Sequence, residues 1–485
     1  MHTITKNYLY NAAYQLLVLL CPIVTAPYLS RVLGAENLGI YSYISASGNI
    51  VITLSQLGLY AYGSRQIAYV REQGEQLTGT FWELLLLRAI LGGIGTGIYW
   101  AYGIWLGNGY GGLFWCYYPY ILAQFLDCSW VYVGLEQMKP AVLKNFAAKL
   151  INVAGIFLLV RSREDLRRYI LLLAVTALLC NLSIYTQLRH YIGRPVRCPR
   201  QLKRHLRGAV ALFLPQAAAL AYLQMDKVML GWITGEAQQV SFYDQAEKII
   251  SIPLSLITVI STVMMPRLAN VYSARRQEQL QKLLLEAGRY GILMAMPMMM
   301  GILVVARQMI PWYLGGEFEQ TASVMLVLSP MVLLNALTGV SGKQYFTATD
   351  QTKVLLAAYG VAAGVNGLAN ALLIPRWGCM GAAAASVAAA LCSMAIQYAV
   401  LGRQLEIKPM GGYVLRYGAG ALGMACVLWG LTHGMRPAWT VTLMQIGGGC
   451  LLYGVYLLLC RDPAVQAVKK LLHRKMKNQE PEEEI

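Results

Sequence analysis

The sequence predicts an all-α polytopic membrane protein with about fourteen transmembrane helices, and two observations predict it. Of its 485 residues, 57% are hydrophobic and only 13% are charged, with a mean hydropathy of +0.48. A soluble domain of this length does not have such a composition. Apolar windows of about 20 residues, each long enough to cross the roughly 30 Å hydrocarbon core of a bilayer, also recur from end to end.

The expected spans follow one another with short loops between them. They lie near residues 8–32, 40–63, 81–105, 111–133, 145–161, 169–188, 209–233, 242–265, 285–309, 322–342, 353–375, 380–401, 412–433 and 439–460. Because this number is even, both termini are expected on the same side of the membrane.

Basic residues set the orientation. Lys and Arg gather in alternate loops, above all in the loop 189–208, whereas the other loops are nearly bare apart from an arginine cluster at 161–168. By the positive-inside rule, both termini are expected to be cytoplasmic, and the protein is expected to be a multi-pass protein of the cytoplasmic membrane. The same pattern accounts for the net charge of +17, so a nucleic-acid partner is not expected.

The most basic loop also divides the chain into similar halves. The stretches 30–43 and 226–245 both carry a basic residue, then Gly34 or Gly231, then Tyr41 or Tyr243 at the entry to the next helix. Duplicated halves are common among transporters, so two pseudo-symmetric six-helix lobes around a central cavity are predicted. The predicted parts are an N-terminal lobe (1–188), a basic cytoplasmic linker (189–208), a C-terminal lobe (209–403), two further helices (404–461) and a cytoplasmic amphipathic tail (462–485).

Polar and charged residues within the spans are the candidate substrate-binding residues. An ionisable side chain near the bilayer centre costs about 2.5 to 3.5 kcal/mol on insertion scales, so such residues usually face a watery cavity. The alternatives are that charges at helix ends extend to the interface and that amides tie helices together; the first is favoured for Arg88 and Arg416. The candidates are Arg31, Asn49, Asp127, Lys149, Asp226, Lys227, Tyr243 and Asn366.

Catalytic and metal-binding signatures are missing from the sequence. It has no CxxC, its five histidines lack metal-ligand spacing, and no nucleophile elbow, phosphate loop or long catalytic loop occurs. We therefore expect no enzyme activity, no metal site and no cofactor.

Several motifs in a fixed order resemble one transporter family. They are APYLSRVLGAENLGIYSY (26–43), LDCSWVYVGLEQMKPAVLKN (126–145), IFLLVRSREDLRRYI (156–170), DKVMLGWITGEAQQVSFYDQAEKIISIP (226–253), VMMPRLANVYS (263–273) and VNGLANALLIPRWGCMGAAAASV (365–387). In these the chain resembles the lipid-linked oligosaccharide flippases for O-antigen and capsule repeat units, the polysaccharide transporter family of the multidrug/oligosaccharidyl-lipid/polysaccharide exporter superfamily. One departure is the alanine run 388–390, where such sequences often carry an acidic residue.

The resemblance implies a location in the bacterial cytoplasmic membrane, a function and partners. It implies translocation of undecaprenyl-pyrophosphate-linked repeat units by alternating access between two lobes, with membrane lipids, a polysaccharide polymerase and glycosyltransferases as further partners. Arg31 and Lys227 would then engage the pyrophosphate, and Asn and Tyr side chains the sugars. Asp127 and Asp226 would neutralise those cations or take up a proton or sodium ion. The alternatives are a cation-coupled multidrug exporter of the same superfamily, a lipid II flippase and, from a different class, a membrane glycan polymerase or ligase.

Overall fold

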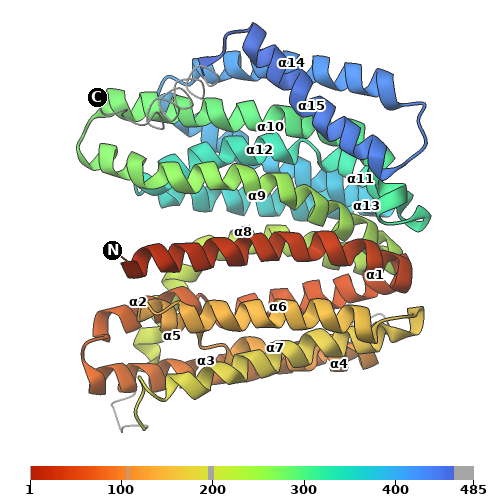
Figure 1. The fold of residues 1–485 in the computed structure, drawn as a ribbon. Coiled ribbons are helices and arrows are strands. Elements are labelled where there is room, and N and C mark those ends of the chain that lie inside the picture. The colour runs from red at the N-terminus through yellow and green to blue at the C-terminus, as the bar shows by residue number, and fades with distance from the viewer. Residues whose placement is uncertain (1, 106–108, 195–200, 464–485) are drawn as a thin grey trace, which may run out of the picture. The chain divides into compact units, whose positions relative to one another are not determined.

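The structure is a computed structural model that describes residues 2–105, 109–194 and 201–463 (Figure 1). For residues 2–16, 19, 214–223, 259, 260, 262 and 263 it describes the backbone only. These ranges are helical, with no β-strand among them. The predicted tail from 464 onward lies outside them.

The helices follow one another with short connections. They are α1 (His2–Gln56), α2 (Leu59–Val70), α3 (Gly74–Trp105), α4 (Gly111–Leu126), α5 (Ser129–Gly134), α6 (Lys139–Leu159), the 3₁₀ turn η1 (Arg163–Asp165), α7 (Leu166–Leu188), α8 (Leu202–Thr234), α9 (Ala237–Ser273), α10 (Gln277–Tyr313), the 3₁₀ turn η2 (Gly316–Phe318), α11 (Glu319–Leu328), α12 (Met331–Thr338), the π-helix η3 (Gly339–Phe346), α13 (Thr352–Gln404), α14 (Lys408–Thr432) and α15 (Trp439–Leu459).

Each expected span falls on helical chain in this structure. The spans at 40–63, 111–133 and 322–342 are interrupted by short breaks at 57–58, 127–128 and 329–330. Within the described ranges, seven helices are long and apolar enough to cross a membrane, or eight if the bent pair Gly316–Leu328 and Met331–Phe346 is one span. The chain is thus an all-helical multi-pass membrane protein, and the count of fourteen crossings stays a prediction.

Two helices each hold two expected spans, joined at a glycine. Gly34 interrupts α1 with φ 79° and ψ 174°, and Gly378 interrupts α13 with φ 55° and ψ −131°. Side chains with a Cβ rarely adopt such angles, so glycine permits both breaks. In the second half, α8 ends at Gly235 (φ 67°). Gly231 stays inside α8, where a Cβ would come within 2.5 Å of the Tyr43 ring.

The chain divides into two compact units. Of the described residues, unit 1 comprises those within 1–248 and 359–389, and unit 2 comprises those within 249–358 and 390–463. The chain therefore passes between the units once within α9 and twice within α13. The lobe boundaries predicted from the sequence stay predictions.

In unit 1, α4 lies along α7, and α6 also packs on α7 (Figure 1). Helix α1 packs against α3, α6 and α8. The apolar core of this unit includes Phe81, Trp130, Val131 and Ile67. These contacts hold the polar residues of α1, α4 and α8, described below, inside one packed body.

In unit 2, α10 packs against α11, α12, α14 and α15. Near the end of α15, Asp462 is fully buried, and its carboxylate accepts hydrogen bonds from Arg289 Nη2 (2.6 Å) and Tyr417 Oη (2.9 Å). This ion pair ties α15 to α10 and α14.

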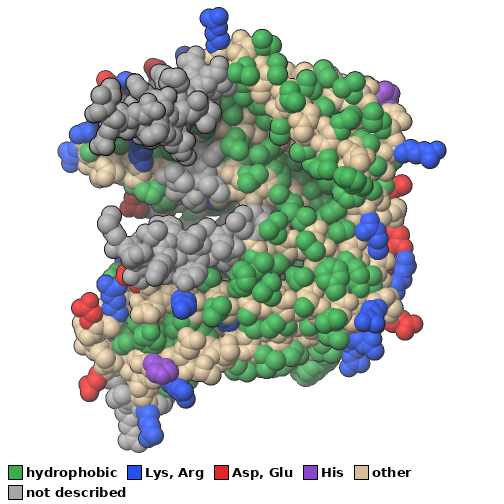
Figure 2. All heavy atoms as spheres, in the orientation of Figure 1, with side chains coloured by type: hydrophobic (Ala, Val, Ile, Leu, Met, Phe, Trp, Pro, Cys, Tyr) green, Lys and Arg blue, Asp and Glu red, His purple; other side chains and the backbone are tan. Residues whose placement is uncertain are grey.

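The surface view agrees with a membrane location. On the face in Figure 2, hydrophobic side chains cover the middle of the helices and charged side chains gather toward the helix ends. An apolar band bordered by charge is the arrangement that a bilayer requires.

Candidate functional site

Asp226 and Lys227 are consecutive residues of α8, so their side chains leave the helix about 100° apart. Each enters a separate polar cluster of unit 1. The Asp226 cluster consists of Asp226, Tyr243, Asn366, Asn370 and Ser386, and the Lys227 cluster of Ser42, Lys227, Asp244, Glu247 and Lys248. A third group, the Asp127 cluster, consists of Arg88, Asp127, Ser129, Lys144 and Asn181.

The Asp226 carboxylate is 2% exposed and accepts hydrogen bonds on both oxygens. Asn366 Nδ2 (2.9 Å) and Asn370 Nδ2 (2.6 Å) donate to Oδ1. Tyr243 Oη (2.6 Å) and Ser386 Oγ donate to Oδ2. All four donors are neutral, so these bonds stabilise the carboxylate without a counter-ion.

Helix α13 supplies three of these donors from both sides of its break. Asn366 and Asn370 lie one turn apart before Gly378, and Ser386 lies beyond it. The break therefore lets two arms of one helix reach the same carboxylate. Asn370 Oδ1 is buried and has no hydrogen-bond partner among the described residues. This oxygen is therefore an unsatisfied acceptor.

The Lys227 cluster is a group of ion pairs centred on Lys227 and Asp244. Lys227 Nζ lies 2.6 Å from Asp244 Oδ1 and 2.7 Å from Glu247 Oε2. Asp244 Oδ2 also lies 2.5 Å from Lys248 Nζ and accepts a hydrogen bond from Ser42 Oγ at 2.8 Å. Helix α1 is thereby tied to α9 through Asp244.

Charges in the Lys227 cluster balance, but its members differ in exposure. The side chains of Asp244 and Lys227 are 5% and 12% exposed, whereas those of Glu247 and Lys248 are 33% and 43% exposed. Removing one partner of a buried ion pair leaves the other charge buried without a counter-ion, which strongly destabilises the fold. The cluster is therefore closed at Asp244 and open at Glu247 and Lys248.

The Asp127 cluster lies at the break between α4 and α5. Asp127 leaves the helical conformation with ψ 115°, and its Oδ1 accepts hydrogen bonds from the Ser129 amide at 3.0 Å and from Lys144 Nζ at 2.7 Å. Lys144 Nζ also donates to Ser129 Oγ (2.8 Å) and Asn181 Oδ1 (2.7 Å). The Asp127 carboxylate, just before α5, thus faces the buried Lys144 of α6.

Arg88 of α3 donates hydrogen bonds to the backbone at this break. Its side chain is 2% exposed, and it donates from Nε to the Phe125 carbonyl (2.9 Å) and from Nη2 to the Gln124 carbonyl (2.6 Å). Gln56 Nε2 donates to the same Gln124 oxygen at 3.2 Å. These donors satisfy carbonyls that the end of α4 leaves open. The prediction that Arg88 extends to the interface is wrong, because the broken helix gives its guanidinium acceptors inside the unit.

Sequence reasoning missed Lys144 as a site residue and assigned it to a cytoplasmic loop. The structure places it in the second turn of α6, buried against Asp127. Pro140 was the available signal, because proline favours the first turn of a helix and so moves the start of α6 forward to Lys139.

The remaining predicted site residues lie outside these clusters. Arg31 is exposed on α1 and donates from Nη1 to the Pro27 carbonyl at 2.9 Å. Asn49 is half-buried on α1. Lys149 is half-buried on α6. Arg31 lies three residues before Gly34, whereas Lys227 lies eight residues before Gly235, so the two cations differ in position relative to the breaks.

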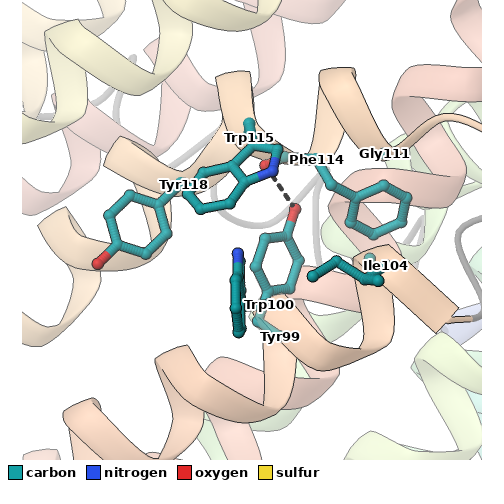
Figure 3. Close-up of a pocket in the computed structure, with 8 residues that line it drawn as sticks. Tyr99, Trp100, Ile104, Gly111, Phe114, Trp115 and Tyr118 are labelled. Carbon is teal, nitrogen blue, oxygen red and sulfur yellow. Dashed lines mark hydrogen bonds between the residues drawn. The ribbon is translucent and has the colours of Figure 1, made fainter.

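A small aromatic pocket lies between α3 and α4, away from these clusters. It holds about 10 Å³, room for roughly one water, and is lined by Tyr99, Trp100, Phe114 and Trp115 among others (Figure 3). Across the described residues, no group of three or more His, Cys, Asp or Glu side chains could hold a metal ion.

Comparison with known proteins finds relatives that are named for related functions. A putative O-antigen transporter from Escherichia coli is 22% identical over 371 residues, which cover 73% of this chain and 87% of that protein. A probable low-salt glycan biosynthesis flippase from Haloferax volcanii is 24% identical over 460 residues, covering 92% of this chain and 93% of that protein. These relatives are named as transporters or flippases.

The fold is shared with a solved transporter structure. The lipid II flippase MurJ in an inward closed conformation superposes with a TM-score of 0.74 at 15% identity, covering 94% of this chain and 99% of that one. At this identity the likeness shows the fold alone.

A family model described as polysaccharide biosynthesis protein matches residues 4–272, which are 269 of the 485 residues. The match contains four of the six ordered motifs in full and nearly all of a fifth. It confirms the family resemblance that those motifs predicted. The protein therefore belongs to the polysaccharide biosynthesis protein family.

Proposed function

We propose that the protein flips undecaprenyl-pyrophosphate-linked oligosaccharide repeat units across the cytoplasmic membrane for surface polysaccharide biosynthesis, by alternating access. The Lys227 cluster is the observation that carries this proposal, because it places two cations on α8 and α9, which hold the expected spans 209–233 and 242–265. The family, and relatives named for O-antigen and glycan transport, support it.

The substrate explains why charge is needed inside the membrane. Each unpaired hydroxyl moved into hydrocarbon costs about 4 to 8 kcal/mol on the cyclohexane scale, and an oligosaccharide head group carries many, together with two phosphates. The protein therefore gives the head group a polar passage while the lipid tail stays in the bilayer.

Lys227 binds the pyrophosphate by exchanging its acidic partners. Its ammonium already holds two carboxylates, and Glu247 is the more exposed of them. A phosphate oxygen replaces that carboxylate without leaving Lys227 unpaired, which avoids the cost of a stranded buried charge. Lys248, which is 43% exposed and pairs with Asp244, adds positive charge on the open side, and Arg31 supplies a further exposed cation on α1.

Ion coupling, if it operates, belongs to Asp226 rather than to Asp127. Protonating Asp127 would leave Lys144 and Arg88 facing a neutral group, whereas the donors around Asp226 are neutral in either state. A proton on Asp226, or a sodium ion beside it, therefore leaves no side-chain cation without its counter-ion. A sodium ion there would also give the unpaired Asn370 Oδ1 a partner. Transport partners in this proposal are the lipid-linked oligosaccharide and membrane lipids, with a polymerase and glycosyltransferases acting before or after.

Charge reversal tests the proposal. In cells that depend on this protein for surface polysaccharide, Lys227→Glu and Arg31→Glu should abolish the polymer and cause a lipid-linked glycan to accumulate, whose chemistry names the substrate. The matched control is Lys353→Glu, an exposed lysine at the start of α13, which should leave the polymer unchanged. All three variants are checked for abundance in the membrane.

The outcomes separate the rival functions. Normal polymer in both Lys227→Glu and Arg31→Glu cells would overturn the assignment of these cations. Rescue of cells depleted of their peptidoglycan flippase would instead favour a lipid II flippase. Drug resistance on expression would favour a multidrug exporter.

A further inference from the structure

Four tyrosines of unit 1 form a continuous group beside the Lys227 cluster. Tyr41 of α1 meets Tyr169 of α7 edge to face with ring centroids 4.9 Å apart. Tyr41 also contacts Tyr117 of α4 at 6.5 Å, and Tyr117 stacks on Tyr120 at 4.8 Å. We call Tyr41, Tyr117, Tyr120 and Tyr169 the tyrosine group.

Sequence features bring these three helices together at this point. Tyr41 lies seven residues after the break at Gly34, in the second arm of α1. About two turns on, Gly48 faces α4, and a Cβ there would come within 2.8 Å of the Tyr117 ring. The missing side chain at Gly48 thus lets the Tyr117 ring lie directly against α1.

The group divides into two supporting rings and two more accessible ones. Tyr117 and Tyr169 are 2% and 7% exposed, whereas Tyr41 and Tyr120 are only partly buried. Rings packed on buried neighbours lose little freedom when a ligand binds. Tyr41 and Tyr120 are therefore held in place by buried neighbours, while each residue stays partly accessible.

The tyrosine group borders the charged residues directly. Ser42, the neighbour of Tyr41 in the chain, donates to Asp244 at 2.8 Å, and Asp244 pairs with Lys227 at 2.6 Å. Beyond the tyrosines, the partly buried residues on the same faces of the two helices are uncharged until Asp127: Ser45 and Asn49 on α1, and Gln124 on α4. A neutral hydrogen-bonding surface thus begins beside the lysines.

We propose that Tyr41 and Tyr120 form a subsite for the first sugar ring of the head group, the one bonded to the pyrophosphate. This inference rests on the proposed function. A pyranose has apolar C–H faces and a rim of hydroxyls, which match an aromatic ring carrying a phenol. The first sugar is covalently attached to the phosphate, so a phosphate at Lys227 brings that ring to the adjacent surface. An isoprenoid tail has no hydroxyls to match and gains nothing from the phenols.

Two probes separate sugar binding from phosphate binding. The purified protein, reconstituted in lipid nanodiscs, is titrated with undecaprenyl pyrophosphate alone and with undecaprenyl pyrophosphate bearing one N-acetylhexosamine or one hexose. The ratio of the two dissociation constants measures what the sugar contributes. The wild type should bind at least one sugar-bearing probe about tenfold more tightly than the bare lipid, since one or two net hydrogen bonds and a ring contact are gained.

The variants assign that preference to the tyrosines. Tyr41→Leu and Tyr120→Leu should reduce the ratio to about one while binding of the bare lipid is kept, and Tyr41→Phe should retain part of it because the ring remains. The matched control is Tyr28→Leu, a tyrosine of the same helix whose ring packs on Phe157 at 4.6 Å. It should leave the ratio unchanged.

Each result decides between the two proposals. A wild type that prefers no sugar-bearing probe, or leucine variants that keep the preference, would overturn the tyrosine subsite alone. Loss of all binding in Lys227→Gln, with binding of the bare lipid kept in the tyrosine variants, would support the phosphate role independently. A wild type that binds neither kind of probe would overturn the proposed function and the subsite with it.

Discussion

At the scale of single residues, Asp127 and Asp226 are both carboxylates within unit 1, but the charges of their donors differ. Asp127 faces Lys144, with Arg88 close by, whereas Asp226 is held by two amides and two hydroxyls. The sequence predicts both as site residues. It does not separate them, because the donors come from residues up to 160 positions away along the chain.

Replacing Asp127 by Asn should destabilise the protein. Lys144 and Arg88 would then be buried without a counter-ion, and breaking a buried pair costs about 3 to 5 kcal/mol. Thermal unfolding of the purified variant in detergent should show a lowered midpoint. Asp127→Asn combined with Lys144→Gln should recover part of the loss. A single variant as stable as the wild type would mean that the pair contributes little.

Replacing Asp226 by Asn should leave stability nearly unchanged and remove ion dependence. The amide has the shape of the carboxylate, and the surrounding hydroxyls and amides can reorient to meet it. Transport in proteoliposomes should therefore lose its response to a sodium or proton gradient. If the wild type itself shows no such response, Asp226 has no coupling role.

At the scale of elements, breaks in helices position the polar residues. Three breaks bring together side chains that one straight helix would keep apart. They lie at Gly34, at Gly378 and between α4 and α5. Sequence reasoning located the two halves of the pattern but aligned Gly34 with Gly231. Packing against Tyr43 explains Gly231, and the backbone requirement falls on Gly235. A glycine alone does not reveal which of these two reasons applies.

Gly34 and Gly235 should respond differently to asparagine. At Gly34 the angles φ 79° and ψ 174° are essentially confined to glycine, so Gly34→Asn should cost about 1 to 3 kcal/mol. At Gly235 the angles φ 67° and ψ −1° are near the left-handed region that asparagine tolerates. Unfolding midpoints of the two variants check this. Equal losses at both positions would contradict it.

At the scale of the whole molecule, hydropathy predicts where helices run, and the structure bears this out at every expected span. Hydropathy does not predict how the chain is shared between compact units, because that depends on contacts between distant helices. Segment 359–389, for example, belongs with residues 1–248. Asn366, Asn370 and Ser386 of this segment donate hydrogen bonds to Asp226. The local composition of the segment does not predict that contact.

Membrane orientation can be checked with reporter fusions. With both termini cytoplasmic, green fluorescent protein fused after residue 193 should fluoresce, and alkaline phosphatase fused after residue 315 should be active. The reason is that the first site follows an even number of expected spans and the second an odd number. Each reporter exchanged between the two sites should be silent. The opposite pattern would reverse the predicted orientation.

Helix α13 has a consequence for how a change at Asp226 spreads. Its first turns and its last turns belong to unit 2, while its middle, with Asn366, Asn370 and Ser386, belongs to unit 1. A shift in the bonds at that carboxylate therefore pulls on backbone that enters the other unit at both ends. The link from that carboxylate to both ends of the helix is covalent main chain.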